Sequence, residues 1–257
     1  MSTNIAIEAE NLTKIFNDET VAVENLSLKI PKGKIFGFLG PNGAGKSTTI
    51  HLLMGILTPT SGTMKVLGKD PTGPEKFEIR KKIGFMPQEV SLYEDLTPLE
   101  HCIFFGELNG MSKREAKESS LKLLNFFGLE DKKDTQVHSL SGGMKRRTSL
   151  CISLVHNPEL IIMDEPTVGV DPALRRNFWA YFRELNKKGI SFLITTHVFD
   201  EVDRMDEILL MYHGQLIEKG TPKELKDKYN VDSLEEIFLI ISDKKETKIG
   251  KEDQNDS

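Results

Sequence analysis

A glycine-rich segment between an apolar run and a helical pattern carries the residue types that bind a phosphate chain. Residues 40–47 read Gly-Pro-Asn-Gly-Ala-Gly-Lys-Ser and fit the pattern GxxxxGK[ST]. Glycines let the backbone close around an anion, so that successive N–H groups and the next helix N-terminus point at it. Lys46 would then reach the terminal phosphates of a nucleotide, and Ser47 would bind Mg²⁺. The predicted contacts are Gly40, Pro41, Asn42, Gly43, Ala44, Gly45, Lys46, Ser47 and Thr48.

Two acidic residues end a second apolar run. Leu160 to Met163 is followed directly by Asp164 and Glu165. Ligands of open α/β sheets collect at the carboxyl ends of the strands, so both carboxylates can lie beside the phosphate loop. We therefore predict that Asp164 binds Mg²⁺ and that Glu165 acts on the attacking water as general base. A solvated acidic pair is the alternative, and the phosphate loop argues against it.

Strands that alternate with helices must position these groups, which predicts an α/β fold with a mostly parallel sheet. Period-two patterns predict the first two strands, with a one-residue slip near Asn25, and short apolar runs predict buried strands. A hairpin is predicted at 207–217, turning at His213-Gly214. The predicted strands are 5–9, 21–30, 35–39, 63–67, 83–86, 160–163 and 191–195, and the predicted helices between them are 46–55 and 172–188.

The middle of the chain, at about 93–155, reads as a mostly helical lobe inserted into this domain. Thr97-Pro98-Leu99-Glu100 and Ser112-Lys113-Arg114-Glu115 have the form of capping boxes, and a further helix is predicted at 145–155. Two more capping boxes begin at Thr221 and Ser233. Residues 243–257 are nearly all polar, so we expect a disordered tail after a short helix.

Composition restricts the class of protein. The chain has 257 residues, a formal net charge of −5 and an isoelectric point near 5.8, which argues against nucleic acid as main partner. Cys102 and Cys151 form no CxxC pattern, which favours a reducing compartment. The start lacks the pattern of a secretory signal, and no run approaches the roughly 20 apolar residues that span a bilayer. Any membrane role is therefore expected to depend on a partner.

Leu140-Ser141-Gly142-Gly143-Met144, just before a predicted helix and the Asp164-Glu165 strand, resembles the LSGGQ signature of ABC proteins, with Met144 in place of glutamine. With the two motifs above, the chain resembles the ATP-binding subunits of ABC transporters. The resemblance implies a P-loop NTPase fold with a mostly parallel core sheet, an N-terminal antiparallel β subdomain and an inserted α-helical lobe. The ATPase domain would cover 5–230, and 231–257 would form the short helix and tail.

The resemblance also assigns roles to single residues. Phe16 would stack on adenine, Gln88 would contact Mg²⁺ or the attacking water, and His197 would bind the γ-phosphate. Asp171 would communicate across a dimer, and it can also cap the helix that Pro172 begins. A core aromatic, a loop glutamine and a surface histidine are the alternatives for Phe16, Gln88 and His197. In the family, the signature residues contact the ATP of a second subunit; here they are Ser141, Gly142 and Gly143.

These roles imply an ATP-hydrolysing subunit that dimerises head-to-tail around two Mg-ATP. It would power translocation by a separate integral membrane subunit at the cytoplasmic face of the cell membrane. The segments 164–172 and 216–222 resemble the ABC-2 type export subgroup, and the intact motifs favour a homodimer. Val90, Leu92 and Tyr93 are predicted to receive a short helix of the membrane subunit, or else to pack into the chain's own core.

Two alternatives to this interpretation are a non-transport ABC ATPase and a P-loop kinase or GTPase. A non-transport ABC ATPase acting on ribosomes or DNA would have two ATPase units or long coiled coils, and neither pattern is present. A P-loop kinase or a GTPase would lack the signature. The triplet Lys145-Arg146-Arg147 could form a nucleic-acid patch, but we expect it to solvate the signature helix.

Overall fold

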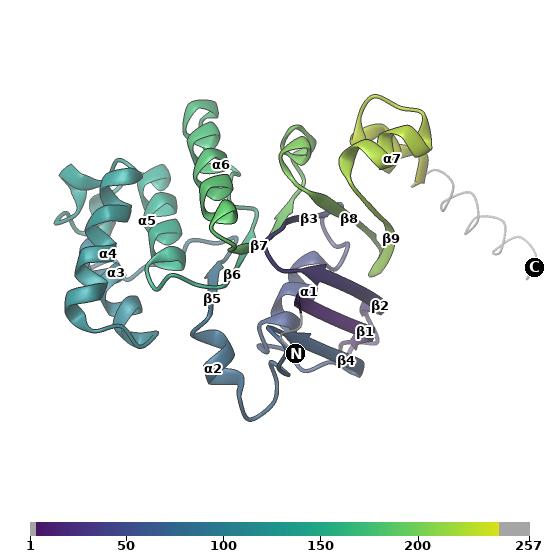
Figure 1. The fold of residues 1–257 in the computed structure, drawn as a ribbon, viewed down its shortest axis with the longest axis horizontal. Helices are drawn as coiled ribbons and strands as arrows, with labels where there is room; N and C mark the ends of the chain where they lie inside the picture. The colour runs from purple at the N-terminus through teal and green to yellow at the C-terminus, as the bar shows by residue number, and fades with distance from the viewer. Residues whose placement is uncertain (1–3, 242–257) are drawn as a thin grey trace, which may run out of the picture.

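The computed structural model describes residues 4–241, and the predicted tail at 243–257 lies outside them. An antiparallel sheet of three strands stands at the N-terminal side, in the order β2-β1-β4 (Figure 1). Its strands are β1 (Ile5–Ile15), β2 (Val21–Pro31) and β4 (Ser61–Val66). Asn11 and Asn25 both have a positive φ of 48° and lie where the pairing of β1 with β2 shifts. The predicted slip near Asn25 is thus confirmed as a β-bulge.

The second sheet has six strands in the order β5-β6-β7-β3-β8-β9. Its first five strands are parallel, and β9 pairs antiparallel with β8. The predicted hairpin at 207–217 is confirmed and extends three residues further. The strands are β5 (Ile83–Met86), β6 (Leu160–Asp164), β7 (Ser191–Thr196), β3 (Ile35–Leu39), β8 (Glu207–Tyr212) and β9 (Gln215–Gly220).

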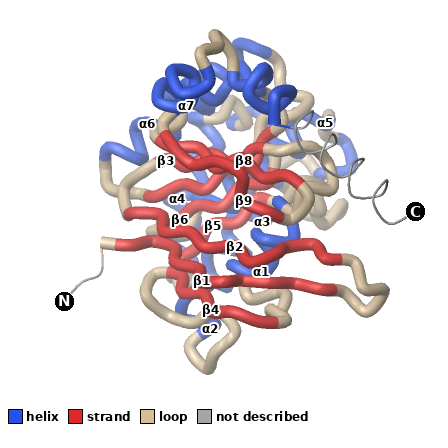
Figure 2. Tube along the Cα trace, turned by 90° about the vertical axis from the view of Figure 1, so that its right-hand side faces the viewer, coloured by secondary structure: helices blue, strands red, loops and turns tan. Residues whose placement is uncertain are grey.

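Both faces of the six-stranded sheet are covered, which explains why its parallel strands are continuous apolar runs. Along β3, Ile35 and Leu39 join the core that contains Phe178 and Phe182 of α6 (Pro172–Lys187). Phe36 and Phe38 join the other core, which includes residues of α1 (Lys46–Leu53) and the antiparallel sheet. Figure 2 shows the strands of the antiparallel sheet below those of the six-stranded sheet, with α1 beside them.

The segment between β5 and β6 forms the predicted helical lobe, which lies at the left in Figure 1. Capping boxes at Thr97 and Ser112 are confirmed. Each of these side chains accepts the backbone N–H of the Glu at N3, and the carboxylate of that Glu accepts the backbone N–H of the N-cap residue. The lobe's helices are α3 (Pro98–Leu108), α4 (Lys113–Phe126) and α5 (Gly142–Leu154), with 3₁₀ turns at Glu130–Lys132 and Val137–Ser139.

The third capping box, at Thr221, begins α7 (Pro222–Tyr229), and residues 234–241 form a helix after Ser233. Two short elements have no counterpart among the predicted ones. These are α2 (Lys76–Arg80) and the 3₁₀ segment Phe199–Arg204.

The prediction for the start of the signature helix was wrong by three residues. α5 begins at Gly142 rather than Lys145, because the Ser141 hydroxyl accepts the N–H of Met144 and fixes Ser141 as the N-cap. Gly142 and Gly143 therefore lie in the first helical turn, and apart from the adjacent backbone of that turn a Cβ built on either would meet no atom of the described chain within 4 Å. Packing among residues 4–241 does not explain why glycines occupy these positions.

A buried histidine connects α3 to the segment after β5. The Nε2 atom of His101 accepts the N–H of Tyr93 at 2.9 Å, while Nδ1 lies 3.0 Å from the carbonyl of Thr97. These contacts suit a neutral ring that donates from Nδ1. The side chain has no exposed surface, and burial lowers the pKa of His101.

We expect stability to fall as the pH drops below about 6.5, the ordinary histidine pKa, because the unfolded chain then binds a proton that folded His101 excludes. Burial also lowers the pKa of His156, which acts in the same direction. His101→Phe should lower Tm at pH 7.5, since Tyr93 loses its acceptor. The same variant should flatten the decline of Tm between pH 7.5 and 5.5. The test is thermal unfolding of both proteins across that range, and equal slopes would contradict the prediction.

Candidate nucleotide-binding site

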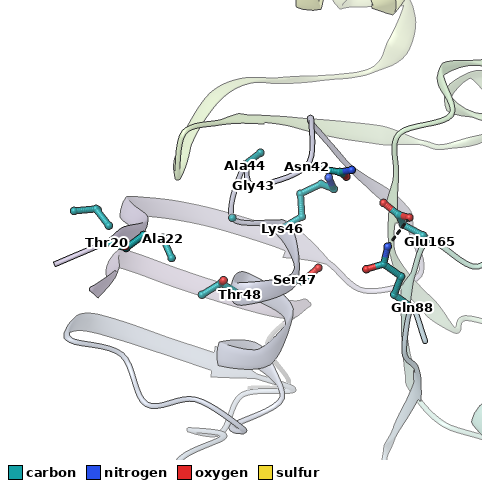
Figure 3. A pocket seen from close by; sticks show the side chains of 12 residues that line it. Thr20, Ala22, Asn42, Gly43, Ala44, Lys46, Ser47, Thr48, Gln88 and Glu165 are labelled. Atoms are coloured by element: carbon teal, nitrogen blue, oxygen red, sulfur yellow. Dashed lines mark hydrogen bonds between the residues drawn. The ribbon is translucent and has the colours of Figure 1, made fainter. Parts of the chain in front are cut away.

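A cavity of about 410 Å³ lies where the phosphate loop, the β1–β2 turn and the carboxyl ends of β5 and β6 converge. This volume is within the usual range of small-molecule sites. Figure 3 shows Lys46 and Ser47 on the side of the loop that faces Gln88 and Glu165. The lining residues are Thr20, Val21, Ala22, Asn42, Gly43, Ala44, Gly45, Lys46, Ser47, Thr48, Gln88 and Glu165.

The loop's glycines meet two different needs. Gly45 has a φ of 98°, and a Cβ there would stand 2.3 Å from the carbonyl oxygen of Ala22, so only glycine fits. Gly43 has a φ of 80° and open space around its missing Cβ, which leaves its backbone accessible from the cavity. Within the described residues, α1 begins without a side-chain cap, so its first N–H groups remain available to an anion.

Lys46 is held inside the loop that it ends. Its ammonium donates to the carbonyls of Gly40 at 2.7 Å and Pro41 at 3.0 Å, and the side chain is 6% exposed. Burial lowers the pKa of Lys46, while the charges of Glu165 and Asp164 oppose that shift. Among the described residues the hydrogen-bond partners of this buried ammonium are carbonyl oxygens, which leaves its positive charge available to bind an anion.

The carboxylate of Glu165 contacts the other two predicted catalytic residues, Gln88 and His197. One carboxylate oxygen lies 3.0 Å from Nδ1 of His197, and the other accepts the amide of Gln88 at 3.0 Å, drawn as the dashed line in Figure 3. Glu165 is buried, at 4% exposure. Its φ of 52° is left-handed, a strained conformation for a non-glycine residue that is found mainly at functional sites.

The donor set near the loop suits magnesium. Asp164 ends β6 and accepts the hydroxyl of Thr195, which β7 places directly opposite. With Ser47 and Gln88 it offers carboxylate, hydroxyl and amide oxygens, the ligands of a hard cation that uses few carboxylates and keeps phosphate oxygens and water. Among the described residues no group of three or more His, Cys, Asp and Glu side chains could hold a metal alone. The residues present thus fit Mg²⁺ bound together with a nucleotide.

Phe16 lies at the edge of this site rather than in its lining. The ring is 39% exposed, and the ammonium of Lys14 stands 5.4 Å from its centroid. Its N–H donates to the carbonyl of Thr20, which does line the cavity. The exposed ring therefore does not belong to the core, so the core alternative is wrong.

The signature residues and Asp171 do not join the cavity. Ser141, Gly142 and Gly143 are exposed at the first turn of α5. Asp171 accepts the N–H of Leu174 at 2.9 Å, which confirms it as the N-cap of α6. In one chain these residues stand apart from the phosphate loop, as the resemblance to a two-chain site requires.

The sequence did not reveal several residues of the site. Thr20, Val21 and Ala22 line the cavity, and Thr195 binds both Asp164 and Glu165. The expectation that the triplet after Met144 solvates α5 was wrong for Arg146 and Arg147. Both guanidinium groups donate to backbone carbonyls instead, as long planar donors can when loops lie within reach.

This fold and site define a P-loop NTPase: a mostly parallel sheet, a phosphate loop before α1 and two acids at the end of a neighbouring strand. A family model described as ABC transporter matches residues 23–168, more than half of the chain. The chain belongs to the ABC transporter family, as an ATP-binding cassette and thus an ATPase by class.

Known proteins support this assignment. The chain is 38% identical over 237 residues to the linearmycin resistance ATP-binding protein LnrL of Bacillus subtilis (strain 168), covering 92% of this chain and 75% of LnrL. It is 40% identical over 240 residues to the probable multidrug ABC transporter ATP-binding protein YbhF of Escherichia coli (strain K12). That match covers 91% of this chain but 41% of YbhF, so the chain spans about two-fifths of that relative's length.

A solved structure with the same fold is dimeric. The ATP-binding cassette MJ0796, in a post-hydrolysis state bound to ADP and Pi, superposes with a TM-score of 0.78 at 25% identity. The match covers 84% of this chain and 98% of that one. In the part of this chain that the structure describes, no helix is both long and apolar enough to cross a bilayer.

Proposed function

We propose that two copies of this chain close head-to-tail on two Mg-ATP, hydrolyse them, and thereby drive substrate translocation by a separate membrane-spanning subunit. The ATPase domain would span 5–230, with the membrane subunit placing it at the cytoplasmic face of the cell membrane. The observation that carries the proposal is the convergence of Gln88, Glu165 and His197 opposite the uncapped start of α1. Nucleic acid is not an expected partner.

In the proposed reaction, ATP phosphates replace the Gly40 and Pro41 carbonyls as partners of the Lys46 ammonium. Water attacks the γ-phosphorus in line and gives its proton to Glu165, while the bond to the β–γ bridging oxygen breaks to release ADP and phosphate. His197 hydrogen-bonds the γ-phosphate. When bound, Mg²⁺ supplies charge neutralisation at the phosphates, and Ser47, Gln88 and Asp164 would hold it.

The dimer is proposed from the first turn of α5. Gly142 and Gly143 are exposed, and in the described part of the chain no packing contact requires a glycine at either position. A helix N-terminus of this kind suits a γ-phosphate held by the phosphate loop of a second chain. Closure would complete the ring of donors around that phosphate and exclude water, which strengthens each contact. The dimeric state of the MJ0796 cassette supports this arrangement.

Export is the proposed direction of transport, by an ABC-2 type membrane subunit. Both relatives compared above have names that refer to drug resistance or multidrug transport, which supports a role in export. The membrane subunit would select the substrate. An alternative function, on ribosomes or DNA, is not favoured by any contact in the described residues.

An exposed aromatic surface is the proposed docking site for the membrane subunit. Tyr93 is 60% exposed and packs edge-on against Phe104 of α3, with ring centroids 6.3 Å apart. Leu108, one turn further along α3, is 62% exposed. Because Tyr93 is mostly exposed, it does not pack into the core, whereas Val90 and Leu92 are half-buried. Val90, Leu92 and Tyr93 follow Gln88 closely in the sequence. Through Gln88, docking at this surface would affect the nucleotide site.

Tyr93→Ala should weaken assembly with the membrane subunit by about 30-fold, because a central exposed aromatic often contributes about 2 kcal/mol to an interface. ATP hydrolysis by the isolated chain should stay within about twofold of wild type. The measurement is co-purification from detergent-solubilised membranes. Phe77→Ala is the matched control, since this aromatic on α2 is 64% exposed and outside the proposed surface. Undiminished assembly of Tyr93→Ala would remove the docking proposal.

The experiment that tests the function as a whole is a mild-detergent pull-down of tagged Glu165→Gln in Mg-ATP, with bound proteins identified by mass spectrometry. A stoichiometric multi-spanning membrane protein is the expected result. Ribosomal or DNA-repair proteins, with no membrane protein, would overturn the transport proposal and favour the alternative.

A further inference from the structure

Arg146 on α5 reaches out of the helical lobe and binds two loops of the nucleotide site. Its Nε atom donates to the carbonyl of Pro166 at 2.8 Å, and Nη1 donates to the carbonyl of Gln88 at 3.2 Å. Nη2 donates to the carbonyl of Glu165. The three nitrogen atoms of one guanidinium thus bind the backbone of two segments, the one after β5 at Gln88 and the one after β6 at Glu165 and Pro166.

An arginine suits this place for a chemical reason. Its planar group directs several N–H donors in fixed directions, whereas a lysine ammonium is a single point with three rotatable donors. The group is half-buried, and burial lowers the pKa of Arg146 while the charges of Glu165 and Asp164 oppose that shift. The guanidinium keeps its charge at neutral pH, because its ordinary pKa lies far above that range.

The contact with Glu165 falls on a strained residue. The N–H of Glu165 donates to the hydroxyl of Thr195 at 2.9 Å and also lies 3.1 Å from the Thr195 carbonyl. The carbonyl of Glu165 accepts an N–H of Arg146, so both backbone polar groups of Glu165 are hydrogen-bonded. Its φ of 52° persists only if the surroundings enforce it. Relaxation to an ordinary φ would turn the carbonyl away from Arg146 and the carboxylate away from His197 and Gln88.

We propose that Arg146 is a positioning residue, which holds the backbone of Glu165 and the Gln88 loop so that the carboxylate points at the attacking water. It is not among the residues that line the cavity, so it would act through Glu165 rather than on ATP. The inference rests on the proposed function, in which Glu165 is the base. Since Arg146 and the exposed Ser141 cap belong to one helix, the base would also be tied to the element expected to contact the second nucleotide.

The first test is steady-state ATP hydrolysis by the full-length chain. Arg146→Ala should lower kcat by about 100-fold, the loss that follows when a reacting group moves by about 1 Å, and leave KM within about threefold. Arg146→Lys should recover part of the loss. Millimolar guanidinium should restore turnover to Arg146→Ala and not to Glu165→Gln. Arg147→Ala is the matched control, because that guanidinium binds the carbonyls of Phe127 and Gly128 inside the lobe.

The second test is a double-mutant cycle. If Arg146 acts through Glu165, Arg146→Ala should change the residual turnover of Glu165→Gln by less than about twofold. A full further loss in that background, or an unchanged kcat in Arg146→Ala, would overturn the proposal. Thermal unfolding shows whether Arg146→Ala is folded. If it is not, Arg146→Lys replaces it in the test. A lowered kcat with a wild-type Tm in Arg146→Lys supports the positioning role, and a wild-type kcat overturns it. Wild-type turnover in Glu165→Gln would instead exclude Glu165 as the base, the part of the proposed function on which this inference rests.

Discussion

Glu165→Gln is expected to lower kcat for ATP hydrolysis by about 10²–10⁴-fold, the range attributed to a lost general base. The amide has the shape of the carboxylate but cannot accept the proton of the attacking water. Lys46 and the phosphate loop are unchanged, so nucleotide affinity should remain. The variant should therefore accumulate with ATP in the closed dimer. The measurements are phosphate release and the mass of the particle by light scattering, with and without Mg-ATP.

Glu159→Gln provides the control for this experiment. Glu159 precedes the same strand at its opposite end, where it is 47% exposed and binds Lys82 at 2.7 Å. Its loss should leave kcat within about twofold of wild type, as is usual for an exposed ion pair. Unimpaired turnover in Glu165→Gln would exclude Glu165 as the base, and a monomer in Mg-ATP would contradict the proposed closure.

The buried strands were the most predictable part of the fold. The bounds of β3 and β5 agree with the predicted 35–39 and 83–86, because a parallel strand covered on both faces must be apolar throughout. The bounds of α2 could not be predicted in this way. It has five residues, too few for a helical period, and Arg80 holds it through a tertiary bond to the carbonyl of Gly55.

In the site, too, a motif that is contiguous in the sequence could be predicted, whereas contacts made only in the folded structure could not. The phosphate loop is contiguous, so its pattern alone predicts its position. Thr195 is found beside Asp164 only because β6 and β7 pair in parallel at that register. Arg146 lies 58 positions from Gln88 and 19 from Glu165, and its three carbonyl partners are backbone atoms that any residue provides. The sequence therefore could not predict that Arg146 binds these carbonyls.

Lys46→Ala is expected to weaken ATP binding by about 100-fold, because charge-assisted hydrogen bonds contribute roughly 1.5–3 kcal/mol each. Lys46 is 6% exposed and its ammonium donates to the carbonyls of Gly40 and Pro41, so the group is already positioned inside the loop that would hold the phosphates. Since it would reach the β- and γ-phosphates, affinity for AMP should change by less than about twofold.

This difference between nucleotides separates a lost contact from a damaged fold. Calorimetric titration of wild type and Lys46→Ala with ATP and AMP gives both affinities, and thermal unfolding checks the fold. Lys34→Ala is the matched control, because Lys34 is an exposed lysine next to β3 and should leave ATP affinity unchanged. A parallel loss of ATP and AMP affinity would mean that Lys46 maintains the shape of the loop, with the phosphates held by the backbone N–H groups and the start of α1. Unchanged ATP affinity would mean that the nucleotide does not bind at this loop.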